Sequence, residues 1–352
     1  MRRGWIYGVA MLLAGCVEQP APVPVPVVPP EPVVEQRATL LLAGDLMVHT
    51  PQLTAARTAD GYDFSPSFTL LKPLIEEADL ALVNLETTLA EKGAYTGYPL
   101  FRSPASVADA MREAGFDVAL LANNHCMDYG VRGARETHAA LNRVGIRHTG
   151  VFLSHAEHQA APHLYYNLNG LSLVILNYTY GTNGMPVPAP VEVNRIDTVR
   201  MKADLKRARE WMPDCLAVAL HWGIEYERKP NREQRRLAEF LQREGVQLII
   251  GSHPHVVQPI EQDSLGGLII YSLGNLLSNQ HKRYTDGGLM VRVELEKKGD
   301  NPLQMSYQPI PVWVDRAHRY RLMTREAADT LTSNPAARTF FVDTEALLEK
   351  RL

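Results

Sequence analysis

The sequence predicts a layered α/β fold, because apolar segments of strand length alternate with amphipathic segments of helix length along most of the chain. A second observation supports this fold: polar side chains directly follow five of the apolar segments, as at the carboxyl edge of a sheet that carries an active site. The predicted strands cover residues 39–44, 80–83, 117–121, 171–177, 215–220, 246–250, 268–272 and 289–295. The predicted helices cover residues 68–78, 106–114 (with Ser106 as N-cap), 133–144, 195–211 and 231–244, with more helix after residue 327.

Composition sets the broad class of the protein. The chain has 352 residues, 45% hydrophobic and 21% charged, which is ordinary for a globular protein and allows one large α/β domain or two smaller ones. A net charge of -3, with Lys and Arg scattered, gives no reason to expect a nucleic-acid partner. The three cysteines, Cys16, Cys126 and Cys215, match neither a disulfide framework nor a zinc-binding spacing.

The amino terminus has the pattern of an export signal. Arg2 and Arg3 precede an apolar run over residues 5–13, which is too short to span a bilayer as a helix. The run ends in Leu-Ala-Gly-Cys16, which resembles the lipobox of bacterial lipoproteins. The resemblance implies cleavage of residues 1–15, lipidation of Cys16, and a membrane-anchored protein that faces the periplasm or the cell exterior. The alternative is a simple secretory signal with an incidental cysteine. Cleavage would remove two arginines and leave a net charge of -5.

Residues 16–37 form a predicted tether between the membrane and the folded part. Proline lacks a backbone donor and fixes φ, so this segment is expected to be extended and semi-rigid. Its prolines are Pro20, Pro22, Pro24, Pro26, Pro29, Pro30 and Pro32. The main domain is predicted over residues 38–320, followed by a helical C-terminal extension over residues 321–352.

The polar residues that follow the strands are of metal-binding types. They are Asp45, Glu86, Asn124 with His125, His221, and the pair His253 and His255. In an extended segment, side chains two residues apart point the same way, so the two histidines of His-Pro-His are expected to aim at one point. A mixed set of carboxylate, amide and imidazole ligands is typical of a hydrolase centre with two divalent ions, here Mn, Fe or Zn. Cys126, beside His125, is a weaker candidate for a thiol nucleophile.

Six ordered motifs then point to a family. They are Ala43-Gly44-Asp45-Leu46-Met47, Val83-Asn84-Leu85-Glu86, Ala122-Asn123-Asn124-His125, Leu220-His221-Trp222-Gly223, Gly251-Ser252-His253-Pro254-His255 and Tyr271-Ser272-Leu273-Gly274-Asn275. Together, over roughly residues 38 to 315, they resemble the CapA-type poly-γ-glutamate capsule-biosynthesis family. That family looks like a branch of the calcineurin-like metallophosphoesterases, which implies a four-layer α-β-β-α sandwich of the metallo-dependent phosphatase type.

The resemblance also implies roles for individual residues. One ion would lie among Asp45, Glu86 and His255, and the other among Glu86, Asn124, His221 and His253. His125 would protonate the leaving group or stabilise developing charge. Because Cys126 stands where the pattern usually has an acidic residue, Asp128 is expected to orient His125 instead. The implied protein is an envelope-anchored hydrolase that makes, processes or exports poly-γ-glutamate or a related anionic polymer, with capsule-synthesis membrane proteins as further partners. The alternative is a non-catalytic polymer-binding or export lipoprotein that retains a vestigial metal pocket.

The sequence departs from the phosphoesterase pattern at three positions. Met47 stands where that pattern has a histidine, and His49 replaces this ligand only if the chain turns there. Glu86 replaces the bridging aspartate, and Cys126 occupies a position that is usually acidic. The first departure leaves open whether one ion or two bind.

Several residues have a structural interpretation beside the functional one. Glu86 could cap a following helix, and His221 could be a core histidine. Trp222 is either a substrate platform or a packed wall, and Asn275 either lines the pocket or stabilises a turn. The basic segment 228–236 is either a solvated helix face or a surface that attracts a polyanion. The loop over residues 181–190 is expected to overhang the site, and residues 93–101 to form another wall.

Overall fold

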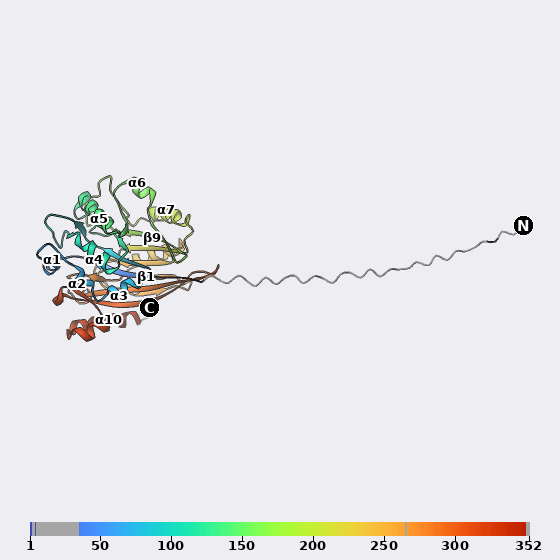
Figure 1. Ribbon diagram of the computed structural model, residues 1–352. Helices are drawn as coiled ribbons and strands as arrows, with labels where there is room; N and C mark the ends of the chain where they lie inside the picture. Colours follow the sequence, from blue (N-terminus) through green and yellow to red (C-terminus); the bar gives the residue numbers. More distant parts are fainter. Residues whose placement is uncertain (2–3, 5–34, 265, 350–352) are drawn as a thin grey trace. The chain divides into compact units, whose positions relative to one another are not determined.

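The computed structural model describes residues 1, 4, 35–264 and 266–349 (Figure 1). Val34–Leu352 form one compact unit. Cys16, most of the expected signal peptide and residues 16–34 of the expected tether lie outside the described residues, so these assignments stay predictions. Residues 35–37, the end of the expected tether, begin the first strand instead. None of the helices in the described part of the chain is long and apolar enough to cross a membrane.

The larger sheet contains the strand that carries Asp45. In the described chain it has eight strands in the order β18-β17-β16-β1-β2-β5-β6, with β15 also paired to β1. The strands β1, β2, β5 and β6 run parallel, whereas β16, β17 and β18 are antiparallel to their neighbours. Their bounds are β1 (Glu35–Leu46), β2 (Leu80–Leu85), β5 (Val118–Leu120), β6 (Arg147–Thr149), β15 (Asn275–Leu277), β16 (Gly287–Lys298), β17 (Gln304–Asp315) and β18 (Arg321–Thr324).

The second sheet contains the strands that end in the histidine motifs. Its order is β13-β14-β12-β11-β9-β8, and β9, β11, β12 and β14 are parallel. Its strands are β8 (Leu164–Leu168), β9 (Leu171–Thr179), β11 (Cys215–His221), β12 (Leu248–Ser252), β13 (Ile260–Gln262) and β14 (Leu268–Ile270). Two small pairs join loops beside the sheets: β3 (Thr88–Ala90) with β4 (Arg102–Pro104), and β7 (Val151–Phe152) with β10 (Glu192–Val193).

The helices cover the outer faces of the two sheets. They are α1 (Thr50–Ala56), α2 (Ser65–Phe68), α3 (Lys72–Glu76), α4 (Ser106–Ala114), α5 (Gly130–Val144), α6 (His155–Ala160), α7 (Thr198–Arg209), α8 (Arg232–Arg243), α9 (Arg325–Leu331) and α10 (Pro335–Glu349), with a 3-10 turn η1 (Arg316–His318). In Figure 1 the labelled strands β1 and β9 lie between α5, α6 and α7 on one side and α10 on the other.

Alternation along the strands explains the layers, because successive side chains face opposite sides of a sheet. Leu40 and Leu42 of β1 pack between the sheets with residues of β9, β11 and β12. Leu41 and Ala43 face the other way, against residues of α2, α4 and α5. On the second sheet, outward residues of β9 and β11 pack against α7 and α8. The predicted four-layer α-β-β-α sandwich is therefore confirmed.

Several predicted helix boundaries change in the structure. The single helix expected over residues 68–78 is two short helices, α2 and α3, each with a proline in its first turn. Ser106 was expected as an N-cap, but Ala105 holds that position and makes no side-chain cap, so the prediction was wrong. The helix expected from residue 195 starts at Thr198, because the Asp197 side chain accepts hydrogen bonds from Val199 N and Arg200 N.

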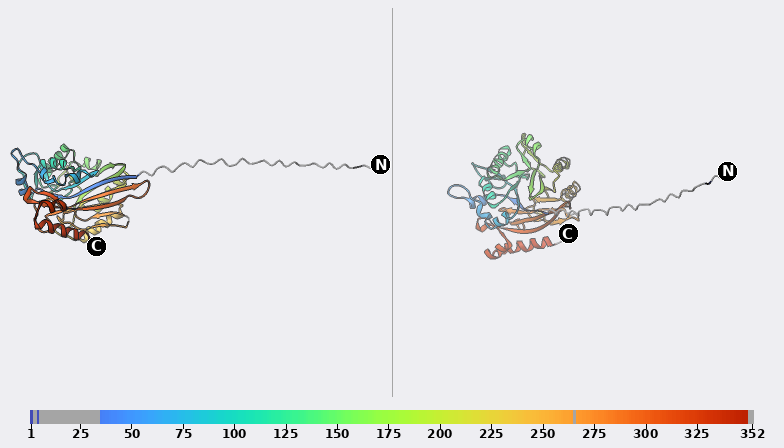
Figure 2. Two further views of the ribbon diagram at one scale, coloured as in Figure 1. Left: turned by 60° about the horizontal axis from the view of Figure 1, so that its bottom comes forward. Right: turned by 45° about the vertical axis from the view of Figure 1, so that its right-hand side comes forward.

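The C-terminal segment is joined to the larger sheet. Its first residues form β18, which pairs with β17. Beyond β18, α9 and α10 cover Trp313 and Met323 through the buried side chains Phe340 and Phe341. The described part of the predicted extension, residues 321–349, is thus mainly helical, and β18 at its start belongs to the larger sheet. Figure 2 shows α10, in red, along the strands coloured orange.

Two glycines let backbones approach closely beside the carboxyl ends of the strands. A Cβ on Gly44 would lie 2.0 Å from the carbonyl oxygen of Gly274, and a Cβ on Gly251 would lie 2.0 Å from that of Tyr271. The neighbouring Asp45 N donates to Gly274 O at 2.9 Å. Glycine at residue 44 therefore allows the contact that places Asp45.

We expect Gly44→Ala to lower the free energy of unfolding by about 1–3 kcal/mol, because the added methyl group overlaps a backbone carbonyl that cannot move freely. Gly181→Ala is the matched control, since a Cβ there would meet no heavy atom within 4 Å. Urea denaturation of both variants measures the difference. Equal stability of the two variants would contradict the steric argument.

Candidate metal centre

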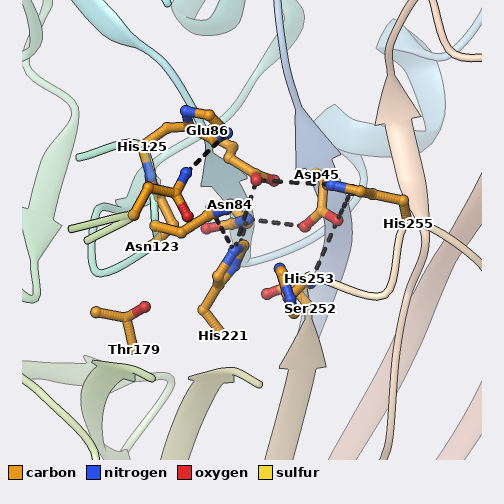
Figure 3. A network of polar contacts seen from close by, with 12 residues as sticks. Asp45, Asn84, Glu86, Asn123, His125, Thr179, His221, Ser252, His253 and His255 are labelled. Atoms are coloured by element: carbon orange, nitrogen blue, oxygen red, sulfur yellow. Dashed lines mark hydrogen bonds and ion pairs between the residues drawn. The ribbon is translucent and has the colours of Figure 1, made fainter. Parts of the chain in front are cut away.

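The predicted site residues come together where strands of both sheets end. They are Asp45 on β1, Glu86 after β2, Asn124 and His125 after β5, His221 at the end of β11, and His253 and His255 after β12. All are buried. Figure 3 shows the side chains of Asp45, Glu86, His221, His253 and His255 close together, from four strands or the segments that follow them. The carboxyl ends of the parallel strands in the two packed sheets thus share one polar cluster.

Asp45 is fixed by hydrogen bonds on both of its oxygens. Asn84 Nδ2 donates to Oδ1 at 2.8 Å, and His253 N donates to Oδ2 at 3.3 Å. His255 Nδ1 lies 3.0 Å from Oδ2. Burial alone would raise the pKa of Asp45, but the hydrogen bond and the charge of His255 outweigh burial and lower it. Asp45 is therefore ionised and oriented.

Glu86 is the least satisfied group in the cluster. Its side chain is fully buried, and neither carboxylate oxygen has a hydrogen-bond partner among the described residues. Oε1 lies 3.5 Å from His221 Nε2 and 3.9 Å from His255 Nε2. Burial raises the pKa of Glu86 to about 8. After Glu86 the chain continues into the strand β3 and not into a helix, so Glu86 is not a helix cap. A buried carboxylate without a partner fits a bound cation.

The two histidines of His-Pro-His converge by a route that the sequence did not predict. The segment is not extended: β12 ends at Ser252, and His253 and His255 have positive φ angles of 97° and 58°. Their ring centroids are 5.9 Å apart. Positive φ is uncommon for residues with a side chain and occurs in turns and at functional sites. The extended-strand argument was wrong, although both imidazoles do reach the cluster.

The two imidazoles differ in charge state. Burial lowers the pKa of His253 to about 2, and its Nδ1 has no partner among the described atoms. Burial also opposes protonation of His255, but the Glu86 and Asp45 carboxylates outweigh it and raise its pKa to about 9. His253 is thus neutral, with a nitrogen available to a ligand.

His221 and Asn124 face each other on the other side of Glu86. His221 Nε2 is 2.9 Å from Asn124 Oδ1, and Asn84 Nδ2 is 3.4 Å from His221 Nδ1. Burial lowers the pKa of His221 to about 3, so it is neutral. Asn123 has a structural role, because its Nδ2 donates to Leu85 O and its Oδ1 accepts from His125 N.

His125 and Asp128 form a second unit beside the cluster. His125 Nδ1 lies 2.7 Å from Asp128 Oδ2, and the same oxygen accepts from Phe101 N at 2.6 Å. The other ring nitrogen, Nε2, lies 3.4 Å from Asn183 Nδ2. Asp128 therefore orients the ring as the sequence suggested. The neighbouring Cys126 is buried, and burial raises the pKa of its thiol to about 12, which argues against a thiolate nucleophile.

Trp222 and Asn275, which were predicted as substrate contacts, both bond to other residues of the fold. Trp222 is buried, donates from Nε1 to Tyr271 O at 2.9 Å and stacks on Tyr271, so it is a packed wall. Asn275 lies beside Asp45 in the strand register, but its Nδ2 donates to Gln280 Oε1 and Thr285 O. It stabilises the loop that follows β15.

The sequence interpretation missed Tyr180 and Glu225. Tyr180 is 48% exposed and packs on His221 and His253, with ring centroids 6.2 Å and 4.6 Å away. It begins the loop that was expected to overhang the site, and Asn183 of that loop reaches His125. Glu225 lies near His253 and His255. A signal for it was present, because Glu225 follows the His221 motif closely in the sequence.

Three overlapping groups of the described side chains have ligand atoms within 4.8 Å of one another. The Asp45 group comprises Asp45, Glu86 and His255, and the His221 group comprises Glu86, His221 and His253. The Glu225 group comprises Glu225, His253 and His255. Carboxylates with neutral imidazoles suit Mn, Fe or Zn. The orphaned Glu86 oxygens and His253 Nδ1 show that this donor set fits a divalent ion.

The chain resembles known proteins in sequence over most of its length. The family model described as "Bacterial capsule synthesis protein PGA_cap" matches residues 39–280. The "Capsule biosynthesis protein CapA" of Bacillus anthracis is 26% identical over 83% of this chain and 74% of its own length. The "PGA biosynthesis protein CapA" of Bacillus subtilis is 28% identical over 75% of this chain and 69% of its own length.

A solved structure supports the fold. The NAD nucleotidase of Haemophilus influenzae aligns with a TM-score of 0.50 over 89% of this chain and 67% of that protein. The sequence identity is 11%, so the likeness concerns the fold alone.

We expect Glu86→Gln to weaken divalent-metal binding at least tenfold. The glutamine side chain keeps the shape of glutamate but lacks its negative charge, and Glu86 belongs to two of the three ligand groups. Glu294→Gln, an exposed change on β16, is the matched control. Metal analysis after equilibration with Mn²⁺ measures the loss. Equal metal content in the two variants would refute the assignment of Glu86.

We expect the metal-stripped protein to lose stability as the pH rises from 7 to 9. The folded chain holds protons on Glu86, whose pKa rises from 4.5 to about 8, and on His255, whose pKa rises from 6.5 to about 9. The unfolded chain has released most of these protons by pH 7, so alkali favours unfolding, by on the order of 1 kcal/mol per pH unit. Urea denaturation at pH 7, 8 and 9 tests this. A flat profile in the wild type, or an equal slope in Glu86→Gln, would contradict it.

Proposed function

The chain belongs to the bacterial capsule synthesis protein PGA_cap family, and we propose that it is a metal-dependent hydrolase of the cell envelope that acts in the synthesis or processing of an anionic capsular polymer. The observation that carries the proposal is the Glu86 carboxylate. It is fully buried, has no hydrogen-bond partner among the described residues, and belongs both to the group of Asp45 and His255 and to the group of His221 and His253. Burying a carboxyl group that no described residue satisfies destabilises the fold, and a bound cation would offset that cost, which favours a metal centre over a vestigial pocket.

The residues that would hold metal divide into two sets. Asp45, Glu86 and His255 form one set. Glu86, His221 and His253 form the other, with Asn124 Oδ1 beside His221. A divalent ion bound there would supply Lewis-acid chemistry to a phosphoester or amide. The protein's own contribution is to orient the ligands: Asn84 holds both Asp45 and His221, and the two-sheet core excludes water behind them.

His125 is the proposed general acid. Asp128 Oδ2 accepts from Nδ1, which fixes the orientation of the ring. Nε2 then holds the proton that a leaving group receives. Asn183 lies 3.4 Å from this nitrogen, on the loop that overhangs the site, so the loop marks where the leaving group would be placed.

The polymer is proposed from two considerations. Two relatives carry the names capsule biosynthesis protein and PGA biosynthesis protein, which favours poly-γ-glutamate or a related polymer. Beside the centre, Lys282 Nζ lies 5.5 Å from the Tyr226 ring centroid, and that ring lies 6.3 Å from the ring of His255. A cation there suits an anionic substrate. Lipidation at Cys16 and contact with capsule-synthesis membrane proteins complete the proposal for the envelope.

The basic segment 228–236 offers less support for polymer binding. Arg228 lies over the Tyr284 ring at 3.9 Å and donates to Asp343 O, and Arg235 is paired with Glu261 at 3.0 Å. These two cations are engaged within the fold. The proposal for an anionic substrate therefore rests on Lys282 rather than on this helix.

We expect the protein reconstituted with Mn, Fe or Zn to hydrolyse a phosphoester or a γ-glutamyl oligomer, and His125→Ala to lower turnover by about 10²–10⁴-fold because the leaving group loses its acid. Asp128→Asn should lower turnover less and shift its pH profile. His155→Ala, a change at an exposed histidine elsewhere, is the control.

Product release from chromogenic phosphodiesters and from γ-glutamyl oligomers measures this activity. Polymer binding that persists without turnover in any of the three metals would favour the non-catalytic accessory role instead. Turnover that survives His125→Ala unchanged would remove His125 from the mechanism.

A further inference from the structure

The Asp45 group lacks a ligand on one side. Met47 stands two residues after Asp45, its side chain is buried, and its soft thioether is a poor ligand for a hard divalent ion. Asp45, Glu86 and His255 therefore supply three ligands, whereas a zinc site has four and a manganese site up to six. The His221 group has a fourth potential ligand, since Asn124 Oδ1 lies beside His221.

His49 does not fill the gap. The chain does turn at this residue, which is the N-cap of α1. Its Nδ1 lies 3.2 Å from Gln52 Oε1 and 3.4 Å from Asn279 N, and its ring packs edge-on against Phe101. Among the described residues, His49 belongs to none of the three groups that could hold an ion. Its nearby partners hold it in a structural position.

We propose that Glu225 supplies the missing ligand, so that this chain completes a two-ion centre with a carboxylate from the loop after β11 in place of an imidazole after β1. The inference rests on the proposed function, because it concerns the same metal centre. The Glu225 carboxylate has a ligand atom within 4.8 Å of atoms on both His253 and His255. His255 is also a member of the Asp45 group, so the Glu225 group and the set that lacks a donor share this ligand.

The cluster presents unused ligand atoms to Glu225. His253 is 4% exposed, and its Nδ1 has no partner in the described chain. Glu86 likewise has two unpartnered oxygens. These orphaned atoms come from buried strand ends, whereas Glu225 is exposed and approaches from the solvent side. Glu225 thus completes the cluster at its open edge.

The loop that carries Glu225 is anchored on both sides. Trp222 is buried and bonded to Tyr271 O, which fixes the start of the loop. Tyr226 N donates to Pro254 O at 2.8 Å, and Pro254 lies between the two histidines of the pair. Tyr226 itself has a positive φ of 70°. The hydrogen bond holds Glu225 beside His253 and His255 and couples the two segments directly.

Charge favours the same arrangement. Asp45, Glu86 and Glu225 together bring three negative charges to the cluster, against four positive charges on two divalent ions. One positive charge then remains for an anionic substrate, and a nearly balanced site is less costly to bury. Without Glu225, two ions would face only two carboxylates in this set.

The test is metal binding by the full-length chain. Protein stripped with a chelator is titrated with Mn²⁺ by calorimetry, and bound metal is counted by elemental analysis. Two variants are compared with the wild type: Glu225→Gln and His49→Gln. The matched control is Glu227→Gln, which changes an exposed glutamate two residues along the same loop. Circular dichroism verifies that each variant folds.

We expect two Mn²⁺ ions per wild-type chain. In Glu225→Gln one ion remains and the other binds at least tenfold more weakly, while Glu227→Gln and His49→Gln match the wild type. The inference is overturned if Glu225→Gln binds both ions as the wild type does, or if His49→Gln produces the loss instead. A wild type with one ion overturns the inference but leaves the proposed function standing, whereas a wild type with none overturns both.

Discussion

The burial of the Glu86 carboxylate is the constraint on which the centre depends. Its Oε1 lies 3.5 Å from His221 of one sheet and 3.9 Å from His255 beyond the adjoining strand. An ionised carboxylate in such a place is stable only with a cation beside it. The two sheets must pack as they do, through Leu40 and Leu42 against the opposite sheet, for these ligands to meet at all. The same apolar core therefore stabilises the fold and shapes the site.

Positive φ angles and close contacts between backbones occur at several positions around the centre. His253 and His255 both adopt positive φ, and Gly44 and Gly251 permit close backbone approach just before ligand positions. The two histidines turn the chain after β12, and the two glycines bring neighbouring backbones together within β1 and β12. Positive φ at residues with side chains costs on the order of 1–3 kcal/mol each and persists where the surrounding structure enforces it. The site is thus preorganised by its backbone as well as by Asn84 and Asp128.

In the proposed chemistry, the buried cluster and the loops around it have different roles; these loops are called the rim. The buried residues supply ligands, and His125 with Asp128 supplies a proton at the mouth. The rim is built from loops: Tyr180 packs on His221 and His253, and Tyr226 lies beside His255 with Lys282 over its ring. Substrate selectivity in this family member would reside in these loops, because the strand ends are occupied by ligands. If the proposed function holds, the choice of polymer would depend on these loop residues rather than on the buried strand ends.

The sequence by itself determined the layered fold and the set of polar residues at the strand ends, because strand periodicity and the parallel arrangement bring the carboxyl ends of strands to one edge. It also placed the chain in its family through six short motifs. Only the tertiary structure decided the rest. The orientation of Trp222 and Asn275, the conformation of His253 and His255, and the position of Glu225 depend on contacts between segments that are distant in sequence or irregular in backbone. Local patterns do not encode such contacts, since the Tyr226 hydrogen bond to Pro254 that sets Glu225 in place forms only once the loops after β11 and β12 have met.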